Sequence, residues 1–122
     1  MEKKRILVVD DDRVSLAIAR DMLSEEGFQV ESADSALAAN QYVYGPNPPD
    51  LILLDVVMPL LSGDRKIQFL KEREASRNIP VVLMSGKPRS ELMKIARDSR
   101  ADGFVTKPLE RESLMAAIAR HL

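Results

Sequence analysis

The chain has 122 residues, a length that suits one compact domain. Hydrophobic residues make up 45% of the sequence and charged residues 30%, so we expect a buried core and a hydrated surface. The formal net charge of −1 gives no electrostatic reason for direct nucleic acid binding, and the absence of cysteine excludes disulfides and thiolate chemistry.

The sequence has no apolar run of the ~20 residues that a membrane helix needs. The first residues, MEKKR, are not followed by the apolar stretch of a secretory signal. We therefore expect a cytoplasmic protein that does not insert into membranes.

Short apolar segments alternate along the chain with longer segments of helical spacing. Most of the apolar segments lack polar alternation, which is typical of strands buried on both faces. The segment 28–33 does alternate, with Phe28 and Val30 between polar residues, and this favours a half-exposed edge strand. The predicted strands are 6–9, 28–33, 51–54, 81–84 and 104–106.

The intervening segments predict helices. Their apolar stripes recur at helical spacing and consist of Ile18, Ala19, Met22 and Leu23, then Leu92, Ile95 and Ala96, then Leu114, Ala117, Ile118 and Leu122. Asp34 or Ser35 can cap a helix running through Tyr42, and Ser62 can cap the next one. Pro88 and Glu91 suit the start of a further helix.

The pattern is a strand followed by a helix, repeated five times over a single domain, 1–122. Such a repeat predicts the α/β class, with a parallel sheet covered by helices on both faces. By analogy with other five-fold βα chains, we expect a flavodoxin-like (βα)5 fold, a doubly wound five-stranded sheet with strand order 2-1-3-4-5.

Acidic side chains follow two of the predicted strands. Asp10, Asp11 and Asp12 come after the first strand, and Asp55 comes after the third. In an open parallel sheet these strand ends meet at one edge, where ligands bind. Carboxylates brought together there raise one another's pKa or require a cation. Mg²⁺ meets that requirement because it prefers oxygen ligands and keeps waters that phosphate oxygens can replace.

Three other groups fall at the same edge. Lys107 follows the fifth strand and can pair with a carboxylate or with a phosphoryl group. Ser85 follows the fourth strand and can donate a hydrogen bond to a phosphoryl oxygen. The backbone carbonyl of Val57 can supply a further metal ligand. A nucleophile, a metal and charge stabilisation together predict a site for phosphoryl transfer.

The sequence resembles the response-regulator receiver domains of bacterial two-component signalling, in residues and in spacing, over essentially the whole chain. The matching segments are ILVVDDD (6–12), DLILLDVVMP (50–59), Gly63, VVLMSG (81–86) and DGFVTKP (102–108). The resemblance implies that Asp55 is the phosphoryl acceptor. It implies that Asp10, Asp11 and the Val57 backbone carbonyl complete the magnesium site with Asp55.

The resemblance also assigns the remaining positions. Ser85 stands at the hydroxyl switch position, Lys107 contacts the phosphoryl group, and Phe104 is the aromatic whose rotamer follows Ser85. The Lys107–Pro108 bond matches a peptide bond that is usually cis in the family, which an X–Pro bond adopts readily. Val57 has no hydrogen-bonding side chain to orient a water, so we expect slow hydrolysis of the aspartyl phosphate.

The implied phosphodonor is a sensor histidine kinase or a phosphotransfer protein. The chain itself is expected to act as a signalling domain, not as an enzyme with a separate substrate. Phosphorylation would change the surface of the fourth helix, fifth strand and fifth helix, as a biased two-state equilibrium. An output domain in a longer chain, a protein partner and a phosphorylation-dependent homodimer all remain open.

Two other functions compete with this assignment. The run Asp10, Asp11, Asp12, Arg13, Val14 also fits the DxDx(T/V) motif of haloacid dehalogenase-type phosphatases, in which Asp10 would attack and Asp12 act as acid and base. A pure binding module with the same fold would need no acceptor chemistry.

Several residues also have purely structural interpretations. Asp12 can simply cap a helix, and Phe104 can be ordinary core. The adjacent leucines 60 and 61 can contact a partner or pack inward.

Overall fold

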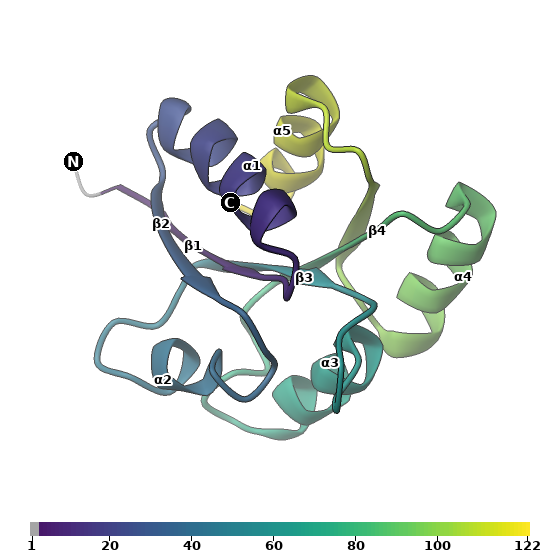
Figure 1. Ribbon diagram of the computed structural model, residues 1–122. Helices are drawn as coiled ribbons and strands as arrows, with labels where there is room; N and C mark the ends of the chain where they lie inside the picture. The colour runs from purple at the N-terminus through teal and green to yellow at the C-terminus, as the bar shows by residue number, and fades with distance from the viewer. Residues whose placement is uncertain (1–2) are drawn as a thin grey trace.

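The computed structural model describes residues 3–122, and residues 1–2 of the expected domain lie outside that range. Five parallel strands form one sheet in the order β2-β1-β3-β4-β5, which confirms the predicted fold class and strand order (Figure 1). The strands are β1 (Arg5–Val9), β2 (Gln29–Ala33), β3 (Leu51–Asp55), β4 (Val81–Ser85) and β5 (Gly103–Thr106).

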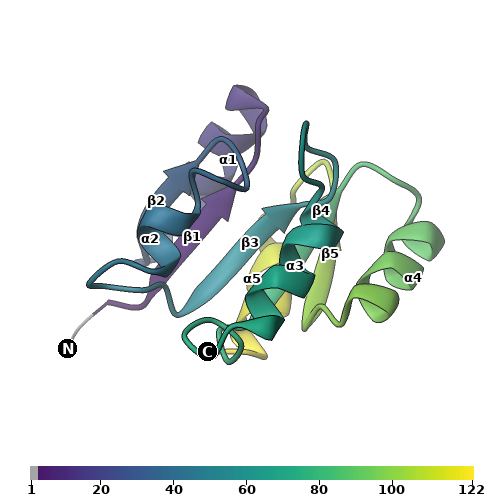
Figure 2. The ribbon, with the colours of Figure 1, turned by 90° about the horizontal axis from the view of Figure 1, so that it is seen from below.

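Helices cover both faces of the sheet, α1 and α5 on one side and α2, α3 and α4 on the other (Figures 1 and 2). They are α1 (Arg13–Glu25), α2 (Asn40–Val43), α3 (Gly63–Glu72), α4 (Arg89–Ser99) and α5 (Arg111–Ala119). Successive residues of a strand belong to two separate cores, one on each face of the sheet. Leu7 and Leu54 face α2, α3 and α4, whereas Val8 and Leu53 face α1 and α5. Because β1, β3 and β4 are buried on both faces, they read as continuous apolar runs.

The register of the central strands determines where the acidic residues lie. Val9 of β1 pairs with Leu54 of β3, so Asp10 and Asp55 follow at neighbouring positions on the same edge. β2 lies at the opposite side of β1 from β3 and is only partly buried, as expected for an edge strand. The sheet therefore brings together residues that are 45 positions apart or more.

The second helix is shorter than predicted. The sequence suggested a helix from Asp34 or Ser35 through Tyr42, but α2 covers only Asn40–Val43. Ser35 does cap the preceding turn, since its Oγ accepts a hydrogen bond of 3.0 Å from the Ala38 amide. The bond from the Asn40 amide to the Leu37 carbonyl spans three residues and that from the Ala39 amide to the Ser35 carbonyl spans four, so this segment mixes a tighter turn with a single α-helical bond.

Three details of the helix predictions were wrong. Ile18 was placed on the buried stripe of α1 but is 43% exposed; the stripe contains the predicted Ala19, Met22 and Leu23 together with Leu16. Leu122 was placed on the final stripe but lies beyond the end of α5 and is exposed. Ser62 precedes α3, yet its side chain makes no capping hydrogen bond. Pro88 and Glu91 do lie at the start of α4.

Across residues 3–122, every helix is too short or too polar to pass through a lipid bilayer.

Candidate functional site

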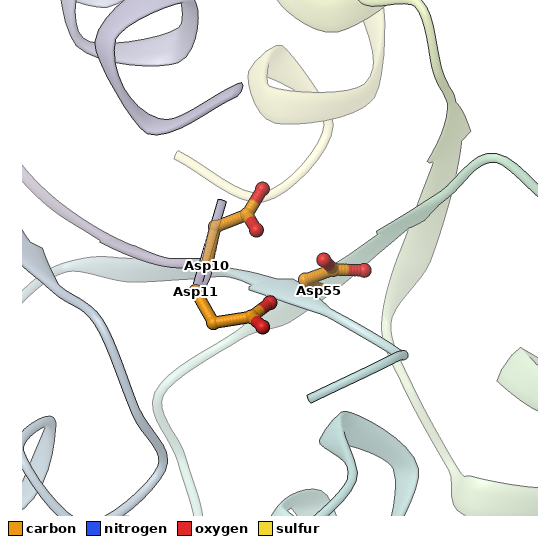
Figure 3. Close-up of side chains that lie close together, drawn as sticks. All are labelled: Asp10, Asp11 and Asp55. Atoms are coloured by element: carbon orange, nitrogen blue, oxygen red, sulfur yellow. The ribbon is translucent and has the colours of Figure 1, made fainter. Parts of the chain in front are cut away.

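Three carboxylates gather beyond the ends of β1 and β3 (Figure 3). Asp10 follows β1 and is fully buried, Asp55 is the last residue of β3 and is 6% exposed, and Asp11 is exposed to solvent. One oxygen of each lies within 4.8 Å of an oxygen of the other two. The structure thus brings together the three side chains that the sequence proposed as metal ligands.

The three oxygens lie close enough for a small divalent cation to draw them together. Octahedral Mg²⁺ holds oxygens at about 2.1 Å, so neighbouring ligands lie about 3 Å apart and opposite ones about 4.2 Å apart. The three oxygens lie within 4.8 Å of one another, so the carboxylates must move inward to share one ion, and the exposed Asp11 has room to do so. Asp10, Asp11, Asp55 and the Val57 carbonyl are the groups that could hold the ion.

Backbone amides orient two of the carboxylates. The Asp12 amide donates to Asp10 Oδ1 at 2.9 Å, and the Val57 amide donates to Asp55 Oδ1 at 3.2 Å. Such bonds hold a carboxylate in place without using a side chain, so the sequence alone gave no sign of them. They leave each oxygen with a lone pair for a metal or a reacting group.

Lys107 joins the same group from the end of β5. Its Nζ donates to Asp10 Oδ2 at 2.7 Å and to Asp55 Oδ2 at 3.2 Å. Burial lowers the pKa of this ammonium, but the hydrogen bond to Asp10 and the charges of Asp55 and Asp10 outweigh burial and raise it. The Lys107 amide bonds the Ser85 carbonyl at 2.8 Å, and the Lys107–Pro108 peptide bond is cis.

The electrostatic balance at Asp55 is unusual for an acid. Burial, and next the adjacent Asp10 carboxylate, raise the pKa of Asp55 to about 6 against the opposing effect of Lys107. The site therefore holds an excess of negative charge that one ammonium does not neutralise. A divalent cation would remove that excess.

Gly63 allows α3 to begin close against the acidic group. Its amide donates to the Val56 carbonyl at 2.8 Å. A Cβ at this position would lie 2.1 Å from the Asp55 carbonyl oxygen and 2.8 Å from its carbon. The close approach of these two backbones requires glycine.

Ser85 and Phe104 lie on the neighbouring strands. Ser85 is buried at the end of β4, one residue beyond Met84, which pairs with Asp55, and its Oγ accepts a hydrogen bond of 3.1 Å from the Lys87 amide. Phe104 is half-buried in β5, and the Arg89 guanidinium lies 5.1 Å from its ring centroid. Sequence patterns gave no sign of this cation–π contact.

Asp12 has a structural role. Its carboxylate accepts hydrogen bonds from the Val14 amide at 3.1 Å and from the Ser15 hydroxyl at 2.9 Å, which caps α1. The Ser15 and Val14 bonds lower the pKa of Asp12. Asp12 is not among the three clustered carboxylates, which agrees with its predicted role as a helix cap.

Leu60 and Leu61 behave differently from each other. Leu60 is fully exposed and has a φ of 71°, whereas Leu61 packs against the core next to α3. Leu61 therefore packs inward, which was one of the two interpretations, and Leu60 is left exposed to solvent.

Comparison with known proteins identifies the family. The family model described as "Response regulator receiver domain" matches residues 6–119. The chemotaxis protein CheY of Halobacterium salinarum is 34% identical over 116 residues, which cover 95% of this chain and 94% of that protein. The phosphate regulon transcriptional regulatory protein PhoB of Escherichia coli is 37% identical over 116 residues, which cover 94% of this chain. The match spans 50% of PhoB.

A solved structure has the same fold. The receiver domain of sensor histidine kinase PA1611 from Pseudomonas aeruginosa, described with a magnesium ion coordinated in its active-site cleft, matches with a TM-score of 0.87. The two are 21% identical, and the match covers 98% of each chain. Together, the sheet order, the acidic group at its edge and the match over 6–119 show that this chain belongs to the response-regulator receiver domain family.

Proposed function

We propose that this chain is a phosphorylatable receiver in which Asp55 accepts a phosphoryl group from a phosphohistidine on a sensor histidine kinase or phosphotransfer protein. The observation that carries the proposal is the grouping of Asp10, Asp11 and Asp55 within 4.8 Å, with Lys107 bonded to two of them. Relatives named as a chemotaxis protein, a transcriptional regulator and the sensor histidine kinase TmoS are consistent with a signalling role.

The reaction is a displacement at phosphorus. A carboxylate oxygen of Asp55 forms the new P–O bond as the P–N bond to the donor imidazole breaks, and the imidazole leaves with that electron pair. Hydrolysis later transfers the phosphoryl group to water, which releases inorganic phosphate and restores the carboxylate. Asp55 reacts in its deprotonated form. Neutralising the negative charge that surrounds it favours that form, and so favours the reaction.

Each neighbouring group has a task in this scheme. Mg²⁺ held at this site would supply neutralisation of the charge on the phosphoryl oxygens. Asp10, Asp11 and the Val57 carbonyl would hold the ion. Lys107, which bonds Asp55 in the unphosphorylated chain, would contact a phosphoryl oxygen instead.

The output would be a change of surface. Ser85 would turn toward the phosphoryl group and Phe104 would follow into the space left, which would change the face formed by α4, β5 and α5. Phe104 borders a cavity on that face, between α4 and α5. This change is a shift between two conformations, biased by the new bond to Ser85.

The test is intact-mass measurement after incubation with acetyl phosphate and Mg²⁺. We expect the native chain to gain one phosphoryl group, and we expect no gain in the Asp55→Ala variant or with the metal chelated. A pure binding module would gain nothing under any condition. A phosphatase working through Asp10 and Asp12 would turn over a phosphate ester independently of Asp55, and either result would overturn the proposal.

A further inference from the structure

A second cavity lies apart from the acidic group, between α2 and α3. Its volume is ≈ 320 Å³, within the range of about 300–1,000 Å³ typical of small-molecule sites. Its walls are mostly apolar and include Tyr44, Phe69, Leu60 and Leu61. None of its lining residues belongs to the group formed by the clustered aspartates and Lys107.

One wall of this cavity holds a buried cation. Lys66 of α3 is only 5% exposed, and its Nζ donates a hydrogen bond to Asn40 Oδ1 of α2. Among residues 3–122, no carboxylate lies within 4.0 Å of this ammonium. An ammonium has three N–H donors, and an amide oxygen does not neutralise its charge. Burial, with a contribution from Arg73, lowers the pKa of Lys66.

A second cation lines the same space. The Arg73 guanidinium lies 5.1 Å from the centroid of the Tyr44 ring, and both side chains line the cavity. Arg73 makes no ion pair with any carboxylate in the part of the chain that the structure describes. Two cations without a counter-charge thus face one apolar space, beside two aromatic rings.

We propose that this cavity binds a small organic acid, with its carboxylate between Lys66 and Arg73 and its aromatic body against Tyr44 and Phe69. A buried charge is unfavourable unless it is paired, so an incoming carboxylate supplies what the protein lacks at Lys66. A fork of guanidinium donors suits a carboxylate. The body of the ligand would also cover Leu60, which is now fully exposed.

The alternative is that Lys66 and Asn40 merely tie α2 to α3. If that is their only role, binding in the cavity should not depend on the charge of the molecule that enters. Binding of an acid should depend on its charge, because an uncharged isostere of the ligand would leave the cations unpaired. The two cases therefore differ in the charge selectivity of binding.

The probes are 2-naphthoate and its neutral isostere 2-naphthamide, each titrated into the full chain and followed by ¹H–¹⁵N NMR. We expect 2-naphthoate to shift the amide signals of Asn40, Lys66 and Phe69. We expect 2-naphthamide to bind about tenfold more weakly or worse, since it loses charge-assisted hydrogen bonds. Equal affinity of the two probes, no binding of 2-naphthoate, or shifts confined to Asp55 and Lys107 would each overturn the proposal.

Variants of the two cations test whether they cause the selectivity for the charged probe. Lys66→Met and Arg73→Gln should each weaken 2-naphthoate by about tenfold and leave 2-naphthamide little changed. Arg65→Gln is the matched control, because Arg65 is an exposed cation of the same helix that does not line the cavity. Should Lys66→Met fail to fold, Arg73→Gln and the comparison of probes still decide. A loss in Arg65→Gln as large as that in Arg73→Gln would contradict the proposed site.

Discussion

At the scale of single residues, Asp55 has an environment unlike that of an exposed acid. It is buried beside Asp10, accepts the Val57 amide and shares Lys107 with Asp10. Burial and the Asp10 carboxylate raise its pKa from 3.8 to about 6 against the opposing effect of Lys107, so near pH 6 the carboxyl is only partly ionised. The same contacts make its charge sensitive to any cation that enters.

The raised pKa predicts a pH dependence of stability in the absence of metal. The folded carboxyl keeps its proton up to about pH 6, whereas the unfolded one loses it near 3.8, so the free energy of unfolding falls as pH rises through that window. Asp55→Asn removes this effect. We expect its stability advantage over the native chain to grow between pH 4 and pH 7, as measured by urea unfolding with a chelator. An advantage that does not change with pH would contradict the assignment.

Lys107→Met tests the charge balance of the site by removing its cation. The change leaves buried Asp10 and Asp55 without their cation, so we expect the free energy of unfolding at neutral pH to fall by about 3 kcal/mol without metal. Mg²⁺ should restore much of that loss, because it replaces the missing positive charge. Urea unfolding with and without Mg²⁺ measures both effects. A loss that Mg²⁺ leaves unchanged would show that packing, not charge, is the cause.

Val57→Asn concerns the lifetime of the phosphorylated form. The Val57 side chain is 59% exposed next to Asp55 and cannot orient a water molecule. An amide at this position can, so we expect the aspartyl phosphate to hydrolyse faster, as followed by the decay of the phosphorylated mass. Val57→Ala, which adds no polar group, is the control. An equal or longer half-life in Val57→Asn would count against slow hydrolysis caused by Val57.

The sequence predicted which residues meet at the site better than it predicted their burial and the causes of their pKa shifts. Asp10, Asp11, Asp55 and Lys107 were found because they follow strands whose ends share one edge. The sequence predicted that the clustered carboxylates would raise one another's pKa or require a cation, but not that burial would be the largest cause of the raised pKa of Asp55. The burial of Lys66 was not foreseeable either, because it depends on neighbours that only the packed helices and strands provide.

At the scale of secondary-structure elements, the approach of α3 to the end of β3 determines the shape of the site. Gly63 has no Cβ and so allows its backbone to lie against the carbonyl of Asp55. Gly63→Ala would force the two elements apart, and we expect a loss of about 2 kcal/mol or more in the free energy of unfolding. We also expect weaker Mg²⁺ binding, because the clash is with the backbone of Asp55 itself.

Gly86→Ala is the matched control for this change. Gly86 follows β4, is exposed, and a Cβ there meets nothing within 4 Å. Its replacement should alter stability by no more than about 0.5 kcal/mol. Equal effects of the two substitutions in urea unfolding would show that the close approach at Gly63 is not a constraint.

Among the elements, strands were easier to predict than helix boundaries. Each predicted strand agrees with the structure to within one residue at either end. In β1, β3 and β4 this is because burial on both faces gives an unbroken apolar run. The prediction of a helix in the segment before α2 was wrong because the hydrogen bonds there include a tight three-residue turn that the composition does not indicate. Ile18 was misplaced because, at about 100° per residue, it lies only about 40° around the helix from the partly buried Met22 and so just outside the buried stripe.

At the scale of the whole molecule, the sheet serves as a scaffold with a separate core on each face. Packing on both sides fixes β1 and β3 next to each other, and so fixes the separation of the carboxylates at their ends. The cavity lined by Lys66 lies on the face covered by α2 and α3. The cavity bordered by Phe104 lies between α4 and α5. The fold thus offers surfaces that are distinct from the acidic group.

The central claim is that carboxylates from the ends of β1 and β3 share one magnesium ion, and calorimetric titration of Mg²⁺ tests it most directly. Asp11 and Asp12 are adjacent and exposed, but only Asp11 belongs to the acidic group, whereas Asp12 caps α1. We predict one site, weakened about tenfold or more by Asp11→Asn and by no more than about twofold by Asp12→Asn. Equal weakening by the two substitutions, or no saturable binding by the native chain, would contradict the account.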